Sequence, residues 1–317
     1  MLFIACETDF DVNSQWEETT VVYGLLDASD ENTLQKIKIS KAFLGEMDAY
    51  EMAQYADSIN YGVDELDVKI YKWDFNQIED SVELIAVPTY RDGEIFYDSI
   101  IVYQFDNVNS FLQKGYEYEL VVKNNKSGNL VSSRTEIVTG FDFDNIFTTK
   151  SKSFQFGLYT NNDFSSSTIT WDDSNDNGKI YQLDLIFHYT EIMDGVDTED
   201  SLIYSLPLID ETESKMKIEG NSFFNFLALN LDKNQSVIRY FNEIDMIMTV
   251  GSEDLETYIN VNKPITGIVQ ERPQFTNINN GIGLFSSRFK KIRFDYDLTS
   301  STLDYLKSVD GLDRNFQ

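Results

Sequence analysis

The segment Tyr181-Gln182-Leu183-Asp184-Leu185-Ile186-Phe187-His188-Tyr189 decides the fold class of this 317-residue chain. Aromatic and aliphatic residues occupy every second position from Tyr181 to Tyr189, and Gln182, Asp184 and His188 fall between them. Successive side chains of a strand point to opposite faces, so this alternation predicts a strand with one buried face and one solvent-facing face. The chain is therefore expected to be mainly β.

The same period-two alternation recurs on both sides of this segment. It is present at residues 36–40, 66–70, 116–120, 202–208 and 292–298, and residues 21–26 and 100–103 are near-continuous apolar runs typical of central strands. Turn-forming stretches separate these runs at 27–32, 91–93 and 124–129. Several short strands at this spacing predict an immunoglobulin-like or fibronectin-like β-sandwich in the N-terminal half.

Helical spacing is confined to a few short segments. One helix is predicted over residues 46–57, and others over 222–231, 252–258 and 301–307, with Ser252 and Ser301 as N-cap residues. A polar stretch over 139–152 marks a boundary. We predict an N-terminal segment outside the domains at 1–18, which is a polar tether from residue 7 onward, a β-sandwich domain at 19–139, and a second β-rich (α+β) domain with a few short helices at 140–317.

The chain is strongly acidic, with 54 Asp and Glu against 25 Lys and Arg and a formal net charge of −29. Nucleic-acid binding relies on Lys and Arg that displace counterions from phosphates, so a nucleic acid is a poor candidate partner. The acids are spread along the whole chain, which is typical of a solvated surface that resists aggregation. Attraction of cations is the alternative interpretation of this charge.

The N-terminus resembles the end of a secretory leader. Met1-Leu2-Phe3-Ile4-Ala5 is a short apolar run, and Cys6, the only cysteine of the chain, follows it directly. Phe3-Ile4-Ala5-Cys6 resembles a bacterial lipobox, in which the cysteine sulfur receives the lipid and the preceding residues are removed. The charged segment expected before such a run is missing, so Met1 would be an introduced or wrongly assigned start. The alternative is an ordinary first strand with a buried free cysteine.

A resemblance to a family covers nearly the whole chain, although each of its motifs is weak alone. Besides Cys6, the matching segments are residues 20–26, 115–122, 169–173 and 273–285. In this order and spacing they resemble uncharacterised lipoproteins of Bacteroidota. The resemblance implies an outer-membrane or cell-surface location and genes that often lie near TonB-dependent transporters. A periplasm-facing anchor is the alternative. The family implies no activity, cofactor or site residue.

Residues 173–178, Asp-Ser-Asn-Asp-Asn-Gly, fit the opening of a calcium-binding loop. Calcium takes six to eight oxygen ligands, and Asp173, Asn175, Asn177 and, at position twelve, Asp184 could contribute them. Position twelve normally carries a bidentate Glu, and the strand predicted from about residue 180 would direct Asp184 along a sheet. The alternative is a hairpin turn rich in Asp and Asn. Calcium is the only cofactor that the sequence indicates.

His188 and a basic cluster are the other candidate contacts. His188, the only histidine, falls on the polar face of its strand, where a lone histidine is usually a plain surface residue, and a zinc site there would need carboxylates. Arg272, Arg288, Lys290, Lys291 and Arg293 gather in one short region of this acidic chain. The four bases from Arg288 to Arg293 could contact an acidic partner or form an ordinary charged strand face.

The sequence supports binding better than catalysis. No Ser-His-Asp, Cys-His or HExxH pattern is present, so we predict that the protein is not an enzyme. We expect a lipid-anchored envelope protein that binds a ligand for, or otherwise assists, an outer-membrane transporter. A structural lipoprotein without a ligand is the first alternative, and a glycan-active enzyme with two facing carboxylates is the second. Tryptophans such as Trp16, Trp73 and Trp171 could stack on sugars in that case. The sequence does not name a small-molecule or glycan ligand.

Overall fold

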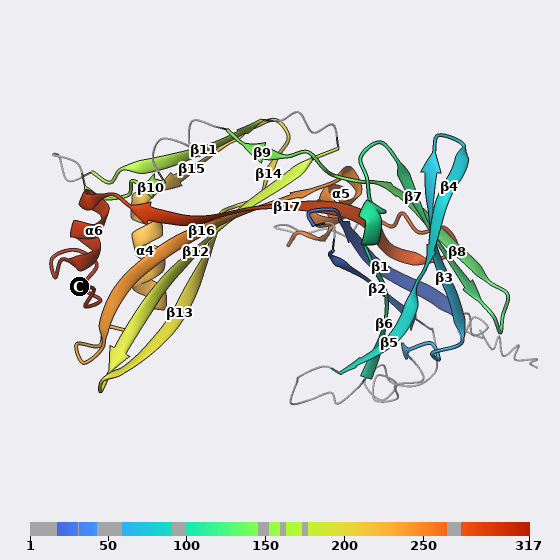
Figure 1. Cartoon of the computed structure of the whole chain (residues 1–317), viewed down its shortest axis with the longest axis horizontal. Helices are drawn as coiled ribbons and strands as arrows, with labels where there is room; N and C mark the ends of the chain where they lie inside the picture. The colour runs from blue at the N-terminus through green and yellow to red at the C-terminus, as the bar shows by residue number, and fades with distance from the viewer. Residues whose placement is uncertain are drawn as a thin grey trace, which may run out of the picture. The chain divides into compact units, whose positions relative to one another are not determined.

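A computed structural model of the chain describes residues 18–30, 32–42, 59–90, 99–144, 152–158, 163–172, 177–264 and 274–317 (Figure 1). The protein is mainly β, with 56% strand, 13% helix and several sheets. The predicted fold class, a β-rich chain of more than one domain with few helices, is thus confirmed. Cys6 and the predicted helix over 46–57 lie outside the described residues.

The chain divides into two compact units. Unit 1 comprises Met1–Leu26, Glu31–Glu136 and Thr257–Ser287, and unit 2 comprises Asp27–Asp30, Ile137–Glu256 and Arg288–Gln317. The division after Glu136 lies close to the predicted boundary at 139. The predicted domains were contiguous, however, whereas residues 257–287 return to the N-terminal unit. The alternation within a single strand does not indicate that a segment far along the chain joins the N-terminal unit.

Unit 1 contains two sheets. One has the order β17-β1-β2-β6-β5, formed by the first part of β17 (Ile282–Leu298) with β1 (Thr19–Asp27), β2 (Leu34–Ala42), β6 (Ser99–Asp106) and β5 (Ile85–Tyr90). The other has the order β4-β3-β7-β8, formed by β4 (Gln77–Glu83), β3 (Leu66–Asp74), β7 (Glu117–Asn124) and β8 (Leu130–Glu136). A 3-10 helix, η1 (Val108–Ser110), follows β6.

Alternation along these strands explains why each sheet of unit 1 has a buried face. Val22, Ile37 and Ile39 are buried on the first sheet, and Ile70 and Leu120 on the second. Residues next to them along each strand are more exposed. Burial contributes about 2 kcal/mol for each such aliphatic side chain, and it is the main force that holds the unit together.

Unit 2 contains a large antiparallel sheet with the order β13-β12-β16-β17. Its strands are β13 (Val196–Ser205), β12 (Ile180–Met193), β16 (Ile238–Gly251) and the second part of β17, and β14 (Ile209–Asp210) and β10 (Ser153–Phe154) pair with β12 and β17. A second sheet has the order β15-β11-β9, with β15 (Lys215–Glu219), β11 (Ser166–Asp172) and β9 (Asp142–Phe143).

The helices α4 (Gly220–Asn230), α5 (Glu253–Asn262) and α6 (Ser300–Lys307) agree in place with the three predicted C-terminal helices. Ser252 directly precedes α5 as predicted. At α6 the N-cap position is Thr299, without a capping hydrogen bond from its side chain, and the predicted N-cap Ser301 lies inside the helix. None of the helices in the described part of the chain is long and apolar enough to cross a membrane.

One face of β12 forms the centre of the unit 2 core. Tyr181, Leu183, Leu185, Phe187 and Tyr189 are all buried there, as the alternation predicted. Ile244, Met246, Met248 and Val250 of β16 join them, together with side chains from the second sheet, α4 and α6. The opposite face of β12 and β16 therefore holds the polar residues of these strands. Here we call this the outer face of unit 2.

A bulge in β17 overturns one prediction. The alternation over 292–298 predicted that Ile292, Phe294, Tyr296 and Leu298 share a buried face. The register instead passes from Met246 opposite Arg293 to Ile244 opposite Tyr296, so the two residues between them on β17 face the single residue Asp245 on β16. The extra residue reverses the side on which later residues lie. Phe294 is consequently 57% exposed, while Tyr296 is 1% exposed.

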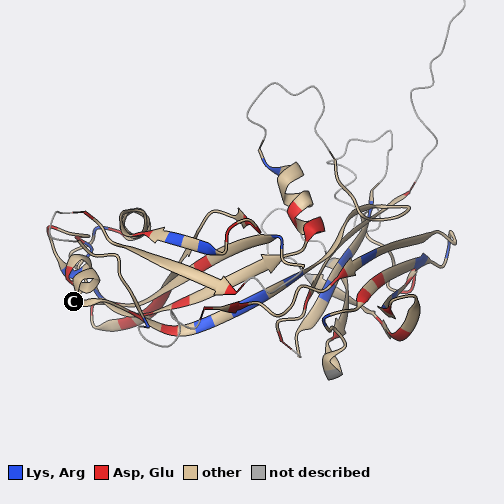
Figure 2. Ribbon diagram, turned by 90° about the horizontal axis from the view of Figure 1, so that it is seen from above, with Lys and Arg blue, Asp and Glu red and all other residues tan. Residues whose placement is uncertain are grey.

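Figure 2 shows Asp and Glu spread over many strands and over α5, without one dominant acidic element. The distribution agrees with the interpretation of the acids as a generally solvated surface.

Candidate functional site

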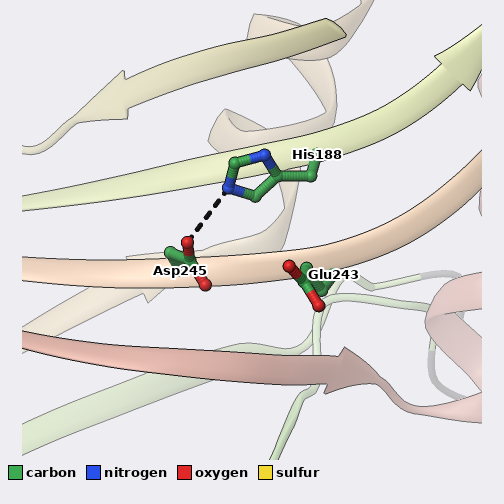
Figure 3. Close-up of side chains that lie close together, drawn as sticks. All are labelled: His188, Glu243 and Asp245. Atoms are coloured by element: carbon green, nitrogen blue, oxygen red, sulfur yellow. Dashed lines mark hydrogen bonds and ion pairs between the residues drawn. The ribbon is translucent and has the colours of Figure 1, made fainter. Parts of the chain in front are cut away.

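The outer face of unit 2 brings together His188, Glu243 and Asp245 (Figure 3). His188 lies on β12 and is directly opposite Glu243 on β16, and Asp245 lies two residues further along β16. His188 Nε2 is 3.1 Å from Asp245 Oδ2. One nitrogen or oxygen atom from each of the three side chains lies within 4.8 Å of the other two. The chain's only histidine is therefore not isolated but faces two carboxylates.

Burial of the opposite face places these three side chains. Phe187 and Tyr189 flank His188 along β12, and Ile244 separates Glu243 from Asp245 along β16, and all three apolar side chains are buried. Because neighbours along a strand alternate, the polar residues between them must point outward. The side chain of His188 is 32% exposed and that of Asp245 is 13% exposed, so solvent reaches the cluster only in part.

Two bulges adjoin the cluster. Between Phe241, opposite Tyr189, and Glu243, opposite His188, the strand β16 contains one extra residue, Asn242. The Asn242 amide donates a hydrogen bond to Thr190 Oγ1 at 3.0 Å. Bulges interrupt strand pairing and redirect side chains, and they are common beside functional sites. This bulge sets the alignment that puts Glu243 opposite His188.

The second bulge, in β17, fixes Asp245. The backbone N–H of Asp295 donates a hydrogen bond to Asp245 Oδ1 at 3.3 Å. Asp295 has a positive φ of 63°, a conformation in which Asp is more common than most other residues. Asp245 therefore has one oxygen held by the backbone of β17 and the other directed at the imidazole, which leaves little rotational freedom to its carboxylate.

The chemistry of this cluster suits metal binding and does not match the carboxylate arrangement of a glycosidase. An imidazole nitrogen and two carboxylates are ligands for divalent transition metals. Glycoside hydrolysis requires two carboxylates that flank the bond to be cleaved. Glu243 and Asp245 are instead side by side on one strand, two residues apart. The same cluster also serves the fold in a simple way, because Asp245 accepts a hydrogen bond from a half-buried histidine.

The residues of the predicted calcium loop are not assembled by the described part of the chain. Asp173 and Asn175 lie outside it, and the Asn177 side chain donates a hydrogen bond to the backbone oxygen of Ile137 at 3.4 Å. Asp184 lies inside β12, opposite Ile247 and Ser205. Four residues of extended strand carry it about 13 Å from Ile180, so it does not fold back as a twelfth loop residue would. Calcium binding by Asp173 and Asn175 stays a prediction.

Three of the four bases predicted to meet a partner are paired within unit 2. Arg288 Nε is 3.0 Å from Asp27 Oδ2, Lys291 Nζ is 3.2 Å from Asp142 Oδ2, and Arg293 also contacts Asp142. Lys290 donates its backbone N–H to Ser29 Oγ at 2.5 Å. The basic side chains of the cluster therefore pair with acids of the same unit that are distant in the sequence. Arg272 lies outside the described residues, and contact with a partner stays a prediction.

Both tryptophans within the described residues are covered, Trp171 by the core and Trp73 on one ring face. Trp171 is buried in the unit 2 core and stacks on Tyr181, with 5.3 Å between ring centroids. The Arg134 guanidinium lies 4.2 Å from the centre of the Trp73 ring and covers it. Trp16 lies outside the described residues.

Sequence reasoning missed Glu243 and Asp245. The signal was present as alternation over residues 238–251, where Ile244, Met246, Met248 and Val250 are apolar at every second position. Recognising that strand would still have left its partner and register unknown, and these place the two acids beside His188.

Comparison with known proteins adds no relative. No protein-family model matches the chain, and no curated protein matches it significantly. The site must therefore be interpreted from its own chemistry.

Proposed function

We propose that this protein is a lipid-anchored accessory protein of the bacterial cell envelope, which acts by binding and not by catalysis. The observation that carries the proposal is Cys6, which directly follows Phe3-Ile4-Ala5 and precedes a polar segment that reaches the first strand at Thr19. Fully extended, residues 7–18 would span at most about 40 Å. Such a segment would hold both β-rich units in water near the membrane.

Lipid attachment at Cys6 supplies a sufficient anchor. Each buried methylene contributes about 0.8 kcal/mol, and two or three acyl chains make membrane attachment stable. A thioether to the lipid requires a thiol, and this chain has a single one. An outer-membrane location, with a TonB-dependent transporter as the partner, is the inference that the sequence resemblance adds.

The outer face of unit 2 supports a role in binding. Ile203 on β13 is opposite Ile186 and 59% exposed, and Ile292 on β17 is opposite Ile247 and also exposed. Aliphatic side chains on the outward side of a sheet, mixed with carboxylates and an imidazole, are suited to a protein partner.

Labelling with radioactive palmitate tests the anchor. In a bacterial host that processes lipoproteins, the protein with its complete leader should take up label and appear in the membrane fraction. The Cys6→Ser variant should take up none and be released into the soluble fraction. An unlabelled wild-type protein of unprocessed length would refute lipid attachment.

The partner is tested separately by crosslinking on intact cells. A photoreactive residue in place of Ile203 or Ile292 should crosslink to a TonB-dependent transporter. The same residue in place of Phe75, an exposed residue in the β3–β4 turn of unit 1, is the matched control. Labelling of Cys6 without any crosslink to a transporter would leave a structural lipoprotein as the better interpretation.

A further inference from the structure

We propose that His188, Glu243 and Asp245 form a binding site for one divalent transition-metal ion of the zinc type. The three side chains come from two adjacent strands of unit 2 and lie on its outer face (Figure 3). The inference goes beyond the proposed function and does not depend on lipid attachment at Cys6.

The distances need little adjustment for an ion to bind. Bonds of about 2.0–2.1 Å at tetrahedral angles place two ligand atoms roughly 3.4 Å apart. His188 Nε2 and Asp245 Oδ2 are already 3.1 Å apart, and all three ligand atoms lie within 4.8 Å of one another. A rotation of the Glu243 side chain would bring its carboxylate oxygen to the same separation from the other two ligand atoms. The ion would replace the proton that Nε2 and Oδ2 share.

The surroundings resemble those of metal sites in a second respect. Ligand carboxylates are usually held by further hydrogen bonds that fix their orientation. The N–H of Asp295 holds Asp245 Oδ1 in this way, from the bulge of a neighbouring strand. An ordinary surface ion pair has two flexible partners, whereas here Asp245 is mostly buried and held from two sides.

The ligand types select the class of ion. Calcium and magnesium prefer oxygen ligands only, so an imidazole among three ligands disfavours both. One nitrogen and two carboxylate oxygens suit Zn²⁺, Mn²⁺ or Fe²⁺. The formal charge of −29 raises the concentration of any cation near the surface, but it does not distinguish one cation from another. Selectivity must therefore come from His188.

Three protein ligands leave a coordination position for solvent or for an outside donor. His188 is about one-third exposed, so water or a donor group of another molecule can reach the ion. A bound ion would thus give the outer face of unit 2 a point of strong and directional attraction for a carboxylate or an imidazole.

The single histidine makes the test specific. The full chain without an affinity tag, and with Cys6→Ser to remove the only thiol, contains one imidazole, whose NMR signals report on His188 alone. Addition of ZnCl₂ at physiological ionic strength should shift these signals and saturate at one equivalent. Asp245→Asn and Glu243→Gln should each weaken the apparent affinity roughly tenfold or more. Asp197→Asn, an exposed carboxylate of β13, should leave it unchanged.

Three results would overturn the proposal. The imidazole signals could stay in place at a tenfold excess of Zn²⁺. They could shift equally in the wild-type background and in Asp245→Asn and Glu243→Gln variants that keep the wild-type backbone spectrum. Ca²⁺ or Mg²⁺ at the same concentration could produce the same shift, which would indicate general attraction of cations by an acidic surface.

Discussion

At the scale of single residues, Asp184 occupies an unfavourable position in β12. Its Oδ1 is buried and has no hydrogen-bond partner among the described residues. Its neighbours in the register are Ser205 and Ile247. A buried polar atom without a partner costs about 1–3 kcal/mol, and β-branched residues suit a half-buried strand.

We therefore expect Asp184→Thr to raise the free energy of unfolding by about 0.5–1 kcal/mol in metal-free buffer. Chemical denaturation of the two proteins measures the difference. Repeating it with calcium adds a second readout. If calcium stabilises the wild type but not the variant, Asp184 is a ligand of the predicted calcium site.

Glu65 in unit 1 is a carboxylate that the fold depends on. Its side chain is 7% exposed, with Lys126 Nζ at 3.0 Å and Lys41 Nζ at 3.5 Å, and the Gly62 N–H donates to it at 3.0 Å. Burial tends to raise the pKa of Glu65, but the hydrogen bonds from Gly62 and Lys126 and the charge of Lys41 outweigh it and lower the pKa below its usual value.

Glu65→Gln should therefore lower the free energy of unfolding at pH 7 by about 2 kcal/mol. A lowered pKa in the folded state stabilises the protein fully above the unfolded pKa, and this contribution disappears as the pH falls through the folded value. The difference between wild type and variant should consequently shrink below about pH 4. Glu83→Gln, which removes a well-exposed partner of Lys69, should cost less than about 0.5 kcal/mol at either pH.

Residue identity predicted the faces of most strands but not the partners of the site. Tyr181 through Tyr189 were placed correctly because burial follows directly from alternation. The pairing of His188 with Asp245 depends on contacts between residues 57 positions apart, and local pattern carries no information about them. The place of Asp184 within β12 depends on sheet pairing for the same reason, and calcium binding by the predicted loop stays a prediction.

At the scale of elements, the close approach of β17 to β1 depends on Gly283. Its φ is +121°, and a Cβ atom at this position would lie 1.9 Å from the backbone oxygen of Val22. No side chain can be accommodated there without separating the two strands.

Gly283→Ala should lower the free energy of unfolding by about 3 kcal/mol or more, because backbone strain and a backbone clash add together. Gly115→Ala separates the two effects, since Gly115 also has a positive φ of 90° but has open space around it, and it should cost about 1 kcal/mol. Thermal or denaturant unfolding measures both. Equal costs would show that the contact with Val22 does not restrict this position.

Elements were predictable where their pattern is regular and unpredictable where a bulge interrupts it. The helices α4, α5 and α6 and most long strands follow the sequence pattern closely. Phe294 was assigned to the core because the alternation of β17 was extended through the bulge near Asp295. A bulge adds one residue without a distinctive composition, so its effect on later faces is visible only with the partner strand in place.

At the scale of the whole molecule, the formal charge of −29 opposes compaction. Repulsion among like charges weakens as salt shortens the screening length from about 30 Å at 0.01 M to about 8 Å at 0.15 M. We expect the melting temperature to rise steadily over this range of NaCl. Choline chloride should produce the same rise, because screening does not depend on the identity of the monovalent cation. A melting temperature that is constant or falls with salt would contradict this expectation.

The two-domain organisation was predicted in outline, but its connectivity was not. Residues 19–139 look complete as a sandwich when strands are counted along the chain. One sheet of unit 1 nevertheless includes the beginning of β17. The Ser133 hydroxyl donates to the backbone oxygen of Asn277, and the Ser287 hydroxyl donates to that of Glu136, so residues 277–287 are bonded to β8. A fragment of residues 19–139 should therefore lack a cooperative unfolding transition, which calorimetry would detect if it were present.

The place of β17 near the end of the chain has a consequence for biogenesis. Both units use this strand, so neither is complete before residues 282–298 have been synthesised. At about 5–20 residues per second, the sheets that contain β17 lack this strand while residues 1–281 are made, although the sheet β4-β3-β7-β8 has all its strands by Glu136. The shared strand thus links the folding of the two units in time, because each unit gains its part of β17 only when that strand emerges from the ribosome.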